Sequence, residues 1–132
     1  DNTTDVPVKG PPGPEYDKLK KISLVVDSFN DQNRKFFTLG DRVSVDELMI
    51  AYHGRTYLKV FMKDKPTRWG FKFWSLNDPQ SGYFYRINPY VGKTTGEAAT
   101  KGLGTKVVLG LVQRCALKPG TLVACDRFFR IN

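Results

Sequence analysis

The sequence predicts a mixed α/β domain, in which a sheet of hairpin-linked strands carries packed helices. Two segments have the apolar spacing of amphipathic helices. Short β-rich runs, separated by turn residues, lie between these two segments. A last apolar run follows the second helix, so a strand–helix–strand crossover should place it parallel to an earlier strand.

The first predicted element is a helix that follows a flexible segment. Residues 1–14 hold four of the eight prolines and show no apolar period, which is typical of a linker. From residue 15 to about residue 37, apolar side chains recur three, four or seven positions apart and form one stripe that should contact the core. The stripe consists of Leu19, Ile22, Val26, Phe29 and Phe36.

Four extended segments follow the first helix. In the first of them, strand alternation places Val45 on one face and Asp46 on the other. The turn residues at 77–82 separate the third segment from the fourth, and Pro89 marks an edge strand or a strand end. The predicted strands are residues 43–50, 56–62, 71–76 and 83–91.

The last third of the chain contains the crossover. A loop over 92–104 leads to a helix from residue 105 to about residue 117, which Pro119 and Gly120 end. Residues 121–126 then form a nearly continuous apolar run, a pattern typical of strands that are buried on both faces. We therefore expect one domain over residues 15–132, behind the linker.

Composition restricts the classes of partner. The chain has 21 Lys and Arg against 13 Asp and Glu, giving a net charge of +8 that favours nucleic acid or another polyanion. No apolar run approaches the roughly 20 residues that cross a bilayer, so we expect no membrane partner. Two cysteines are too few for a disulfide scaffold, and a reducing compartment is the default. The chain begins at Asp1 without a signal segment, and we interpret it as a piece of a longer protein.

Two carboxylates occupy unusual positions. Asp46 lies within the first apolar strand, and Asp126 ends the last one. A carboxylate is costly to bury unpaired, so two of them on strands that could be neighbours suggest a shared cation. Oxygen ligands suit Mg²⁺ or Mn²⁺ better than zinc. The alternative interpretation is that Asp46 caps a backbone group or pairs with an arginine, and that Asp126 simply begins a turn.

A basic segment with interleaved aromatic residues spans residues 55–72. Basic side chains neutralise phosphates, and exposed aromatic rings can stack on bases, so this segment is the predicted DNA-binding element. The alternative is a solvated strand face whose aromatic residues belong to the core. The predicted phosphate contacts are Arg55, Lys59, Lys63, Lys65, Arg68 and Lys72.

Other motifs fail on closer inspection. Residues 92–94 resemble the end of a phosphate-binding loop, but the required first glycine is Ile87. His53 is the only histidine, which argues against a zinc site and against a Ser-His-Asp triad. Cys115 and Cys125 are interpreted as buried thiols rather than as a redox pair.

A set of short motifs occurs in a characteristic order. It consists of residues 45–49 (VDELM), 54–55 (GR), 65–72 (KPTRWGFK), 82–83 (GY) and 90–92 (YVG), then Asp126 followed by Phe128 and Phe129. This ordered set, over residues 16–130, resembles the catalytic domain of piggyBac-type transposases and their domesticated, transposase-derived relatives.

The resemblance implies an RNase H-like fold and cut-and-paste DNA transposition, with two Mg²⁺ or Mn²⁺ ions held by three aspartates. By motif, Asp46 is the first catalytic and metal-binding aspartate and Asp126 is the second. Two metal ions about 4 Å apart can activate a nucleophile and stabilise a departing oxygen. The resemblance further implies double-stranded DNA as the partner, nuclear localisation, and a homodimer as an option for the parent protein.

The sequence also departs from the family pattern. The third aspartate of the family would lie beyond Asn132, and the family's cysteine-rich zinc module is absent from this sequence. Arg127 and Arg130 stand where the family usually has Asn and a small hydroxyl residue. We therefore expect DNA binding but no strand cleavage by this chain alone, so its status as an enzyme stays open. A domesticated, non-catalytic DNA- or chromatin-binding module is the alternative, and an unrelated polyanion-binding domain is the third hypothesis.

Overall fold

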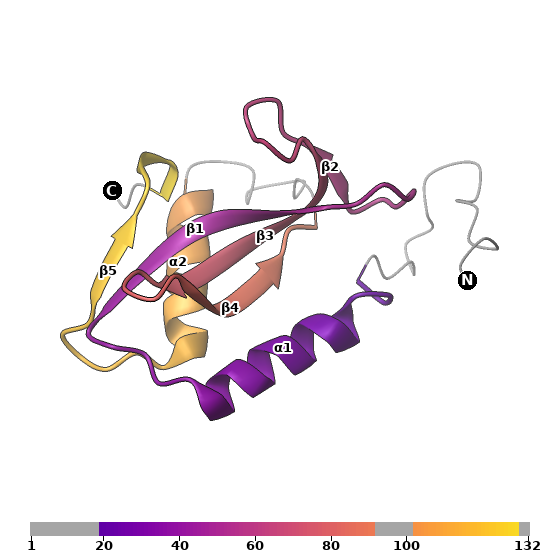
Figure 1. Ribbon diagram of the computed structural model, residues 1–132. Helices are drawn as coiled ribbons and strands as arrows, with labels where there is room; N and C mark the ends of the chain where they lie inside the picture. Colours follow the sequence, from indigo (N-terminus) through magenta and orange to yellow (C-terminus); the bar gives the residue numbers. More distant parts are fainter. Residues whose placement is uncertain (1–18, 92–101, 130–132) are drawn as a thin grey trace.

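The computed structural model describes residues 19–91 and 102–129 (Figure 1). The predicted linker and the loop motif at residues 92–94 lie outside these ranges. Within these ranges two helices and five strands follow one another in the expected order. A short 3₁₀ turn, which the sequence did not predict, follows the last strand. The elements are α1 (Ser23–Phe36), β1 (Arg42–Ala51), β2 (Lys59–Phe61), β3 (Trp69–Asp78), β4 (Tyr83–Pro89), α2 (Leu103–Cys115), β5 (Leu122–Cys125) and η2 (Arg127–Phe129).

The sheet is mixed, as predicted. β3 pairs antiparallel with β1 on one side, and on the other side with β2 at its start and β4 along the rest. β5 pairs with the opposite edge of β1, and this is the parallel pair that the crossover through α2 requires. Figure 1 shows β5 and the beginning of β1 side by side, far from β2.

The face of the sheet that α2 covers contains the main core. Val43 and Val45, two positions apart on β1, both point into this core. β3 contributes Trp74 and Leu76 to the same face. Leu111 of α2 is completely buried against them. Phe129 of η2 packs edge-on against Trp74, with ring centroids 5.5 Å apart. The period-two pattern of β1 therefore predicted its inward face correctly.

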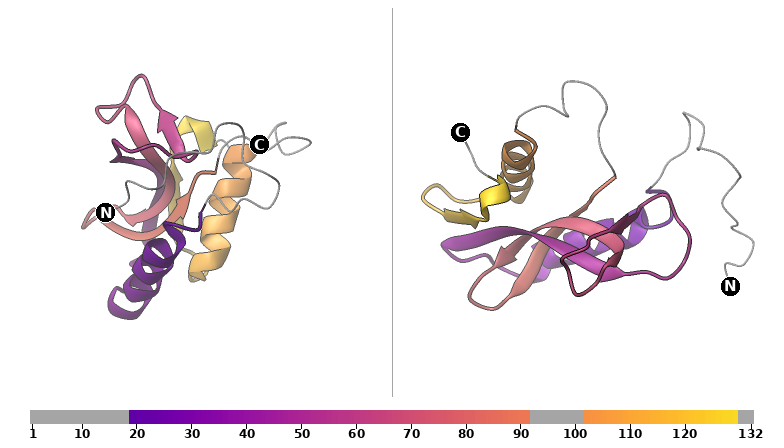
Figure 2. Two further views of the ribbon diagram at one scale, coloured as in Figure 1. Left: turned by 90° about the vertical axis from the view of Figure 1, so that its right-hand side faces the viewer. Right: turned by 90° about the horizontal axis from the view of Figure 1, so that it is seen from above.

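Helix α1 packs against the other face and along β4, and Figure 2 shows the two helices on separate sides of the strands. The Asn30 side chain donates to the Ile87 carbonyl and accepts from the Ile87 N–H, each at 2.9 Å, as a neighbouring strand would. Asn33 donates to the Phe84 carbonyl at 3.0 Å and accepts from the Tyr83 hydroxyl at 2.6 Å. These bonds satisfy polar groups that an edge strand leaves unpaired.

The first helix begins later than predicted, and part of its predicted core stripe is exposed. It begins at Ser23 rather than at residue 15, and residues 19–22 form a turn that precedes it. Phe36, which the apolar spacing places in the core stripe, is 82% exposed, and Phe29 is 38% exposed. The buried positions are Val26, Asn30 and Asn33, because the helix presents its asparagines to the edge of β4.

The last strand also differs from its prediction. A strand buried on both faces was expected, but Leu122 is 62% exposed and its neighbours along β5 are exposed or half-buried. Within the described residues β5 lies at the edge of the sheet, and α1 packs along β4 on the far side of the sheet, so Val123 packs against the α2 core while the other face of β5 is exposed. The second predicted strand shortens to three residues, and the first, third and fourth occupy the predicted places.

Candidate functional site

The two aspartates singled out by the sequence occupy neighbouring positions of the sheet. Val45 of β1 is the register partner of Cys125, the last residue of β5, in the parallel pair. Asp46 is the next residue of β1, and Asp126 is the first residue after β5. Adjacent strands lie about 4.8 Å apart, so such positions are close in space. Strand alternation turns Asp46 away from the α2 core that holds Val45.

Both carboxylates are solvent-exposed and have local partners. One Asp46 oxygen accepts the Glu47 N–H at 2.8 Å, and one Asp126 oxygen accepts the Arg127 N–H at 2.6 Å. Asp126 begins η2, because its carbonyl accepts the Phe129 N–H. The turn that the alternative interpretation predicted for Asp126 is therefore present, and it leaves the carboxylate beside β1.

Two exposed carboxylates on adjacent strands are the kind of oxygen ligands that Mg²⁺ and Mn²⁺ prefer. Over residues 19–91 and 102–129, no three His, Cys, Asp or Glu side chains gather in a group that could hold a metal ion. The described residues thus offer two carboxylates of the kind that a divalent cation prefers, without a third ligand beside them.

Glu47, the residue after Asp46, forms ion pairs with two lysines. No pattern in the sequence predicted these ion pairs. Its carboxylate bonds to the ammonium groups of Lys65 at 3.1 Å and Lys72 at 3.2 Å. Burial works against ionisation of Glu47, but the two lysines outweigh it and lower the pKa of the carboxyl group. Glu47 therefore stays ionised at neutral pH and holds both lysines against β1.

Lys72, which the sequence assigned to DNA, is much less exposed than Lys65. Its side chain is 12% exposed, and its ammonium lies 4.4 Å from the Trp74 ring centroid and 4.9 Å from that of Tyr90. Cation–π contacts of this kind stabilise a charge that has lost much of its water. In this structure Lys72 is directed to Glu47 and two rings rather than to solvent.

The remaining basic residues of the segment are more accessible. Arg55, Lys63 and Arg68 are exposed, and Lys65 is held half-exposed by Glu47. Lys59 donates to the Gly54 carbonyl at 3.3 Å and lies 5.3 Å from the Trp69 ring centroid.

Aromatic residues of this segment divide between the core and the surface. Phe73 and Trp74, just after the segment, are buried, but Tyr57 is 40% exposed, so the interpretation of these aromatic residues as core holds for only part of them. Phe61 and Trp69 are 48% and 53% exposed and pair with each other across β2 and β3, with ring centroids 4.7 Å apart. An exposed ring pair beside Lys59 is suited to stacking on a base.

Gly70 has a structural role within the same segment. It pairs with Ala51, and a Cβ atom at this position would overlap the Ile50 carbonyl oxygen of β1. A side chain there would force β1 and β3 apart. The glycine of this motif is therefore explained by close strand packing.

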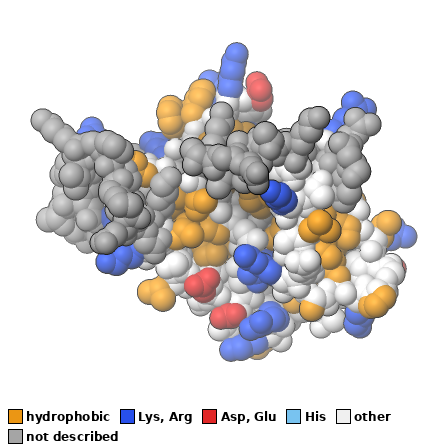
Figure 3. Space-filling view, turned by 180° about the vertical axis from the view of Figure 1, so that it is seen from behind, with side chains coloured by type: hydrophobic (Ala, Val, Ile, Leu, Met, Phe, Trp, Pro, Cys, Tyr) orange, Lys and Arg blue, Asp and Glu red, His pale blue; other side chains and the backbone are white. Residues whose placement is uncertain are grey.

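The positive charge of the chain is dispersed. On the face seen from behind in Figure 3, Lys and Arg side chains of the described residues are scattered among hydrophobic ones and form no single basic surface. The net charge therefore does not by itself locate a nucleic-acid surface on this face.

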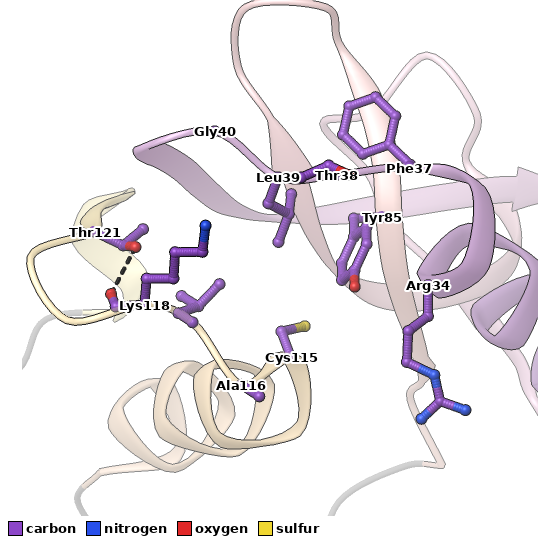
Figure 4. A pocket seen from close by; sticks show the side chains of 11 residues that line it. Arg34, Phe37, Thr38, Leu39, Gly40, Tyr85, Cys115, Ala116, Lys118 and Thr121 are labelled. Carbon is purple, nitrogen blue, oxygen red and sulfur yellow. Dashed lines mark hydrogen bonds between the residues drawn. The ribbon is translucent and has the colours of Figure 1, made fainter.

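A cavity of about 240 Å³ lies between the C-terminal ends of α1 and α2 (Figure 4). Arg34 and Lys118 line it from separate sides, and the Cys115 thiol lies between them. Burial raises the pKa of the Cys115 thiol, so the sulfur stays protonated at neutral pH. Both helices present carbonyl ends here, which disfavours an anionic ligand.

The remaining chemical candidates are far from forming a site. His53 is an exposed loop residue. Cys115 and Cys125 are both free thiols, as predicted, but Cys115 is only half-buried and Cys125 is exposed, whereas both were expected to be buried. No helix within the described ranges is long and apolar enough to cross a membrane.

Comparison with known proteins places the chain in a family. A family model described as transposase IS4 matches residues 2–131. Human PiggyBac transposable element-derived protein 3 is 34% identical over 94 residues, which are 70% of this chain and 16% of the relative. The chain belongs to the piggyBac-type transposase family. The human chimeric ERCC6-PGBD3 protein is likewise 34% identical over 94 residues, which are 9% of its length.

A solved structure of the family has the same fold. The cryo-EM structure of the piggyBac transposase synaptic complex with hairpin DNA matches with a TM-score of 0.60 and 21% identity. The match covers 81% of this chain and 26% of the piggyBac chain. This piggyBac-type chain thus spans about a quarter of the solved transposase and less of its curated relatives.

Proposed function

We propose that this chain is part of an RNase H-like catalytic domain, over residues 15–132, that acts on double-stranded DNA with divalent cations. In this proposal Asp46 and Asp126 supply two carboxylate ligands for Mg²⁺ or Mn²⁺. The observation that supports it is the parallel β1–β5 pair, because Asp46 and Asp126 directly follow its last paired residues, Val45 and Cys125. The motif resemblance of the sequence implies the same roles for these two residues.

The sheet explains how the chain would hold such ligands in place. β1 pairs with β3 over residues 44–51 and with β5 over residues 42–45, so Asp46 projects from a strand that β3 holds at this position and β5 holds just before it. Ser75 of β3 also donates its hydroxyl to the Asp46 carbonyl at 3.1 Å. Asp126 is fixed by η2, whose Phe129 is buried in the core. Bound divalent ions would supply activation of a nucleophile and stabilisation of a departing oxygen.

The basic segment supports the DNA part of the proposal. Arg55, Lys63 and Arg68 are exposed cations suited to phosphates, and the Phe61–Trp69 pair offers ring faces nearby. Nuclear localisation and a homodimer of the parent protein are further expectations of this proposal.

A Mn²⁺ titration tests the metal part. Electron paramagnetic resonance of free Mn²⁺ gives the dissociation constant for the wild type, Asp46→Asn, Asp126→Asn and a control, Asp27→Asn. Asp27 is an exposed carboxylate on α1. We expect each site variant to bind Mn²⁺ about tenfold or more weakly, because a ligand charge is removed, and the control to match the wild type. Equal affinity in all four proteins would refute the metal site.

Fluorescence anisotropy with a labelled DNA duplex tests the DNA part. Lys63→Gln combined with Arg68→Gln should weaken binding. It should also reduce the slope of log affinity against log salt by about 1 for each phosphate that the protein no longer neutralises. Lys106→Gln, at an exposed position of α2, is the matched control for removal of a charge. An unchanged salt slope in the double variant would show that this segment does not contact phosphates.

A domesticated binding module without chemistry is the second candidate. Arg127 favours it, because a cation directly follows Asp126 where the family usually has Asn. This candidate predicts salt-dependent DNA binding with no effect of Asp46→Asn on Mn²⁺ affinity. The two titrations together therefore distinguish it from the catalytic proposal.

A further inference from the structure

Two exposed aromatic rings lie side by side where β2 pairs with the beginning of β3. Phe61 and Trp69 are register partners, and their ring centroids are 4.7 Å apart with the ring planes tilted by 43°. Phe61 is 48% exposed and Trp69 is 53% exposed, whereas Trp74 on the same strand is buried. Because the tilt prevents the two rings from covering each other face to face, ring surface stays open to a partner.

The backbone of Trp69 is held by a strand on each side. Phe61 of β2 pairs with it on one side, and on the other side the Tyr52 N–H donates to the Trp69 carbonyl at 3.4 Å. The next residue, Gly70, is buried and pairs with Ala51 of β1. An aromatic ring on a fixed backbone loses little freedom when a ligand binds, so the contact costs little conformational entropy.

The charges around the ring pair indicate the chemistry of the partner. The Lys59 ammonium lies 5.3 Å from the Trp69 ring centroid, and Lys63 and Arg68 are exposed in the loop between β2 and β3. The basic segment contains a single acidic residue, Asp64. Aromatic surface bordered by cations matches a ligand that combines flat rings with negative charge, and a DNA strand has both.

The ring pair lies on the same face of the sheet as Asp46. Asp46 pairs with Ser75 of β3, and Trp69 precedes Ser75 by an even number of positions, six, so strand alternation gives the three side chains one face. Six positions correspond to about 20 Å along a strand. The rings would therefore contact DNA on the face that presents Asp46, but at a distance from the aspartates.

A ring fixed on a strand can stack only on a base whose face is free. Within a duplex both faces of a base are covered by its neighbours, whereas a base in a single-stranded stretch, or one that has left the stack, offers a free face. We propose that the Phe61–Trp69 pair binds an unpaired base of a DNA strand, with Trp69 as the stacking surface. This inference rests on the DNA part of the proposed function and adds a preference for DNA that contains unpaired bases.

Tryptophan fluorescence tests the stacking, because the chain has two tryptophans and Trp74 is buried. A short oligothymidine should quench the emission of the wild type, since a base stacked on an indole quenches it. Trp69→Tyr keeps a ring at this position and should abolish the quenching, with circular dichroism to confirm folding. Absence of quenching when anisotropy shows that the oligothymidine is bound would overturn the inference, and the rings would then be free for a protein partner.

Fluorescence anisotropy tests the preference with a blunt duplex and with the same duplex extended by single-stranded thymidines. Trp69→Ala should weaken binding of the extended probe about five- to hundredfold, and binding of the blunt probe less than about twofold. Phe36→Ala removes an exposed ring from α1 and should match the wild type on both probes. The salt slope should stay the same in both variants, because neither removes a charge.

The outcomes separate this inference from the proposed function. A loss confined to the extended probe supports both. Salt-dependent binding that Trp69→Ala leaves unchanged, or weakens equally on the two probes, overturns the inference alone. Absence of salt-dependent binding to either probe overturns the DNA part of the proposed function and this inference with it. If Trp69→Ala does not fold, the fluorescence titration of the wild type and Trp69→Tyr decides alone.

Discussion

The two faces of the sheet are built from alternate residues of the same strands, yet they are closed by different forces. On the α2 face, Leu76 and Leu111 are fully buried in an apolar core. On the α1 face, Phe73 and Ile87 border an apolar cavity of about 390 Å³, and α1 is held to β4 by asparagine side chains. Burial of apolar surface therefore dominates on the α2 face, whereas on the α1 face a smaller apolar cluster of Val26, Phe73 and Ile87 is supplemented by hydrogen bonds to an edge strand.

Truncation of a side chain on the α2 face should lower the free energy of unfolding the most. Leu111→Ala removes a completely buried side chain from the centre of the core. We expect the free energy of unfolding to fall by about 3–5 kcal/mol, because the transfer energy of the side chain is forfeited and a cavity remains. Urea denaturation measures it. Phe29→Ala, on the partly exposed α1 face, should lower the free energy of unfolding clearly less. Equal losses of unfolding free energy in the two variants would contradict the contrast between the faces.

The asparagine contacts predict an intermediate effect on the α1 face. Asn30→Ala leaves both the N–H and the carbonyl of Ile87 without their partner at a buried position. The expected loss is about 2 kcal/mol of unfolding free energy, since unsatisfied buried polar groups keep their desolvation cost. Urea denaturation again gives the value, with the exposed Gln32→Ala as control. A neutral Asn30→Ala would mean that water replaces the side chain and that the edge of β4 is open.

These two positions show what the sequence could and could not predict. Val43, Val45 and Leu111 follow simple periods of two and near four, so their inward orientation and the crossover to β5 were predictable. Asn30 and Asn33 look like solvent-facing residues of a helix, and their burial depends on backbone groups of β4 more than 50 positions away. Pattern alone therefore extended the apolar stripe to Phe36, which is exposed.

The candidate site also combines features that the sequence predicted with features that it did not. The positions of Asp46 and Asp126 followed from motif context and from the expectation of a parallel strand pair. The Glu47 link to Lys65 and Lys72 was not predictable, because acidic and basic residues on strands give no periodic signal for their partners. The direction of Lys72 toward Trp74 and Tyr90, rather than to solvent, also required coordinates.

At the rim of the α2 face, the Glu47 ion pairs predict a smaller, pH-dependent effect. The pKa of Glu47 is lowered in the folded state, so its contribution is present above the ordinary value of 4.5 and is lost as the pH falls through the folded-state pKa. Glu47→Gln should reduce the unfolding free energy by about 1 kcal/mol or less at pH 7. Urea denaturation of both proteins at pH 7 and pH 3 should show the difference shrinking in acid. A difference that is the same at both pH values would show that charge is not the cause.

The smallest effect on the free energy of unfolding is expected at an exposed position of α1. Val25 borders the apolar cavity but is 71% exposed, so little apolar surface is buried there. Val25→Ser should change the unfolding free energy by less than about 0.5 kcal/mol, as is usual for exposed positions. A loss above about 1 kcal/mol in urea denaturation would mean that this face is covered in solution. Repeating the measurement at several protein concentrations would then decide whether a second copy covers it, since only association makes stability depend on concentration.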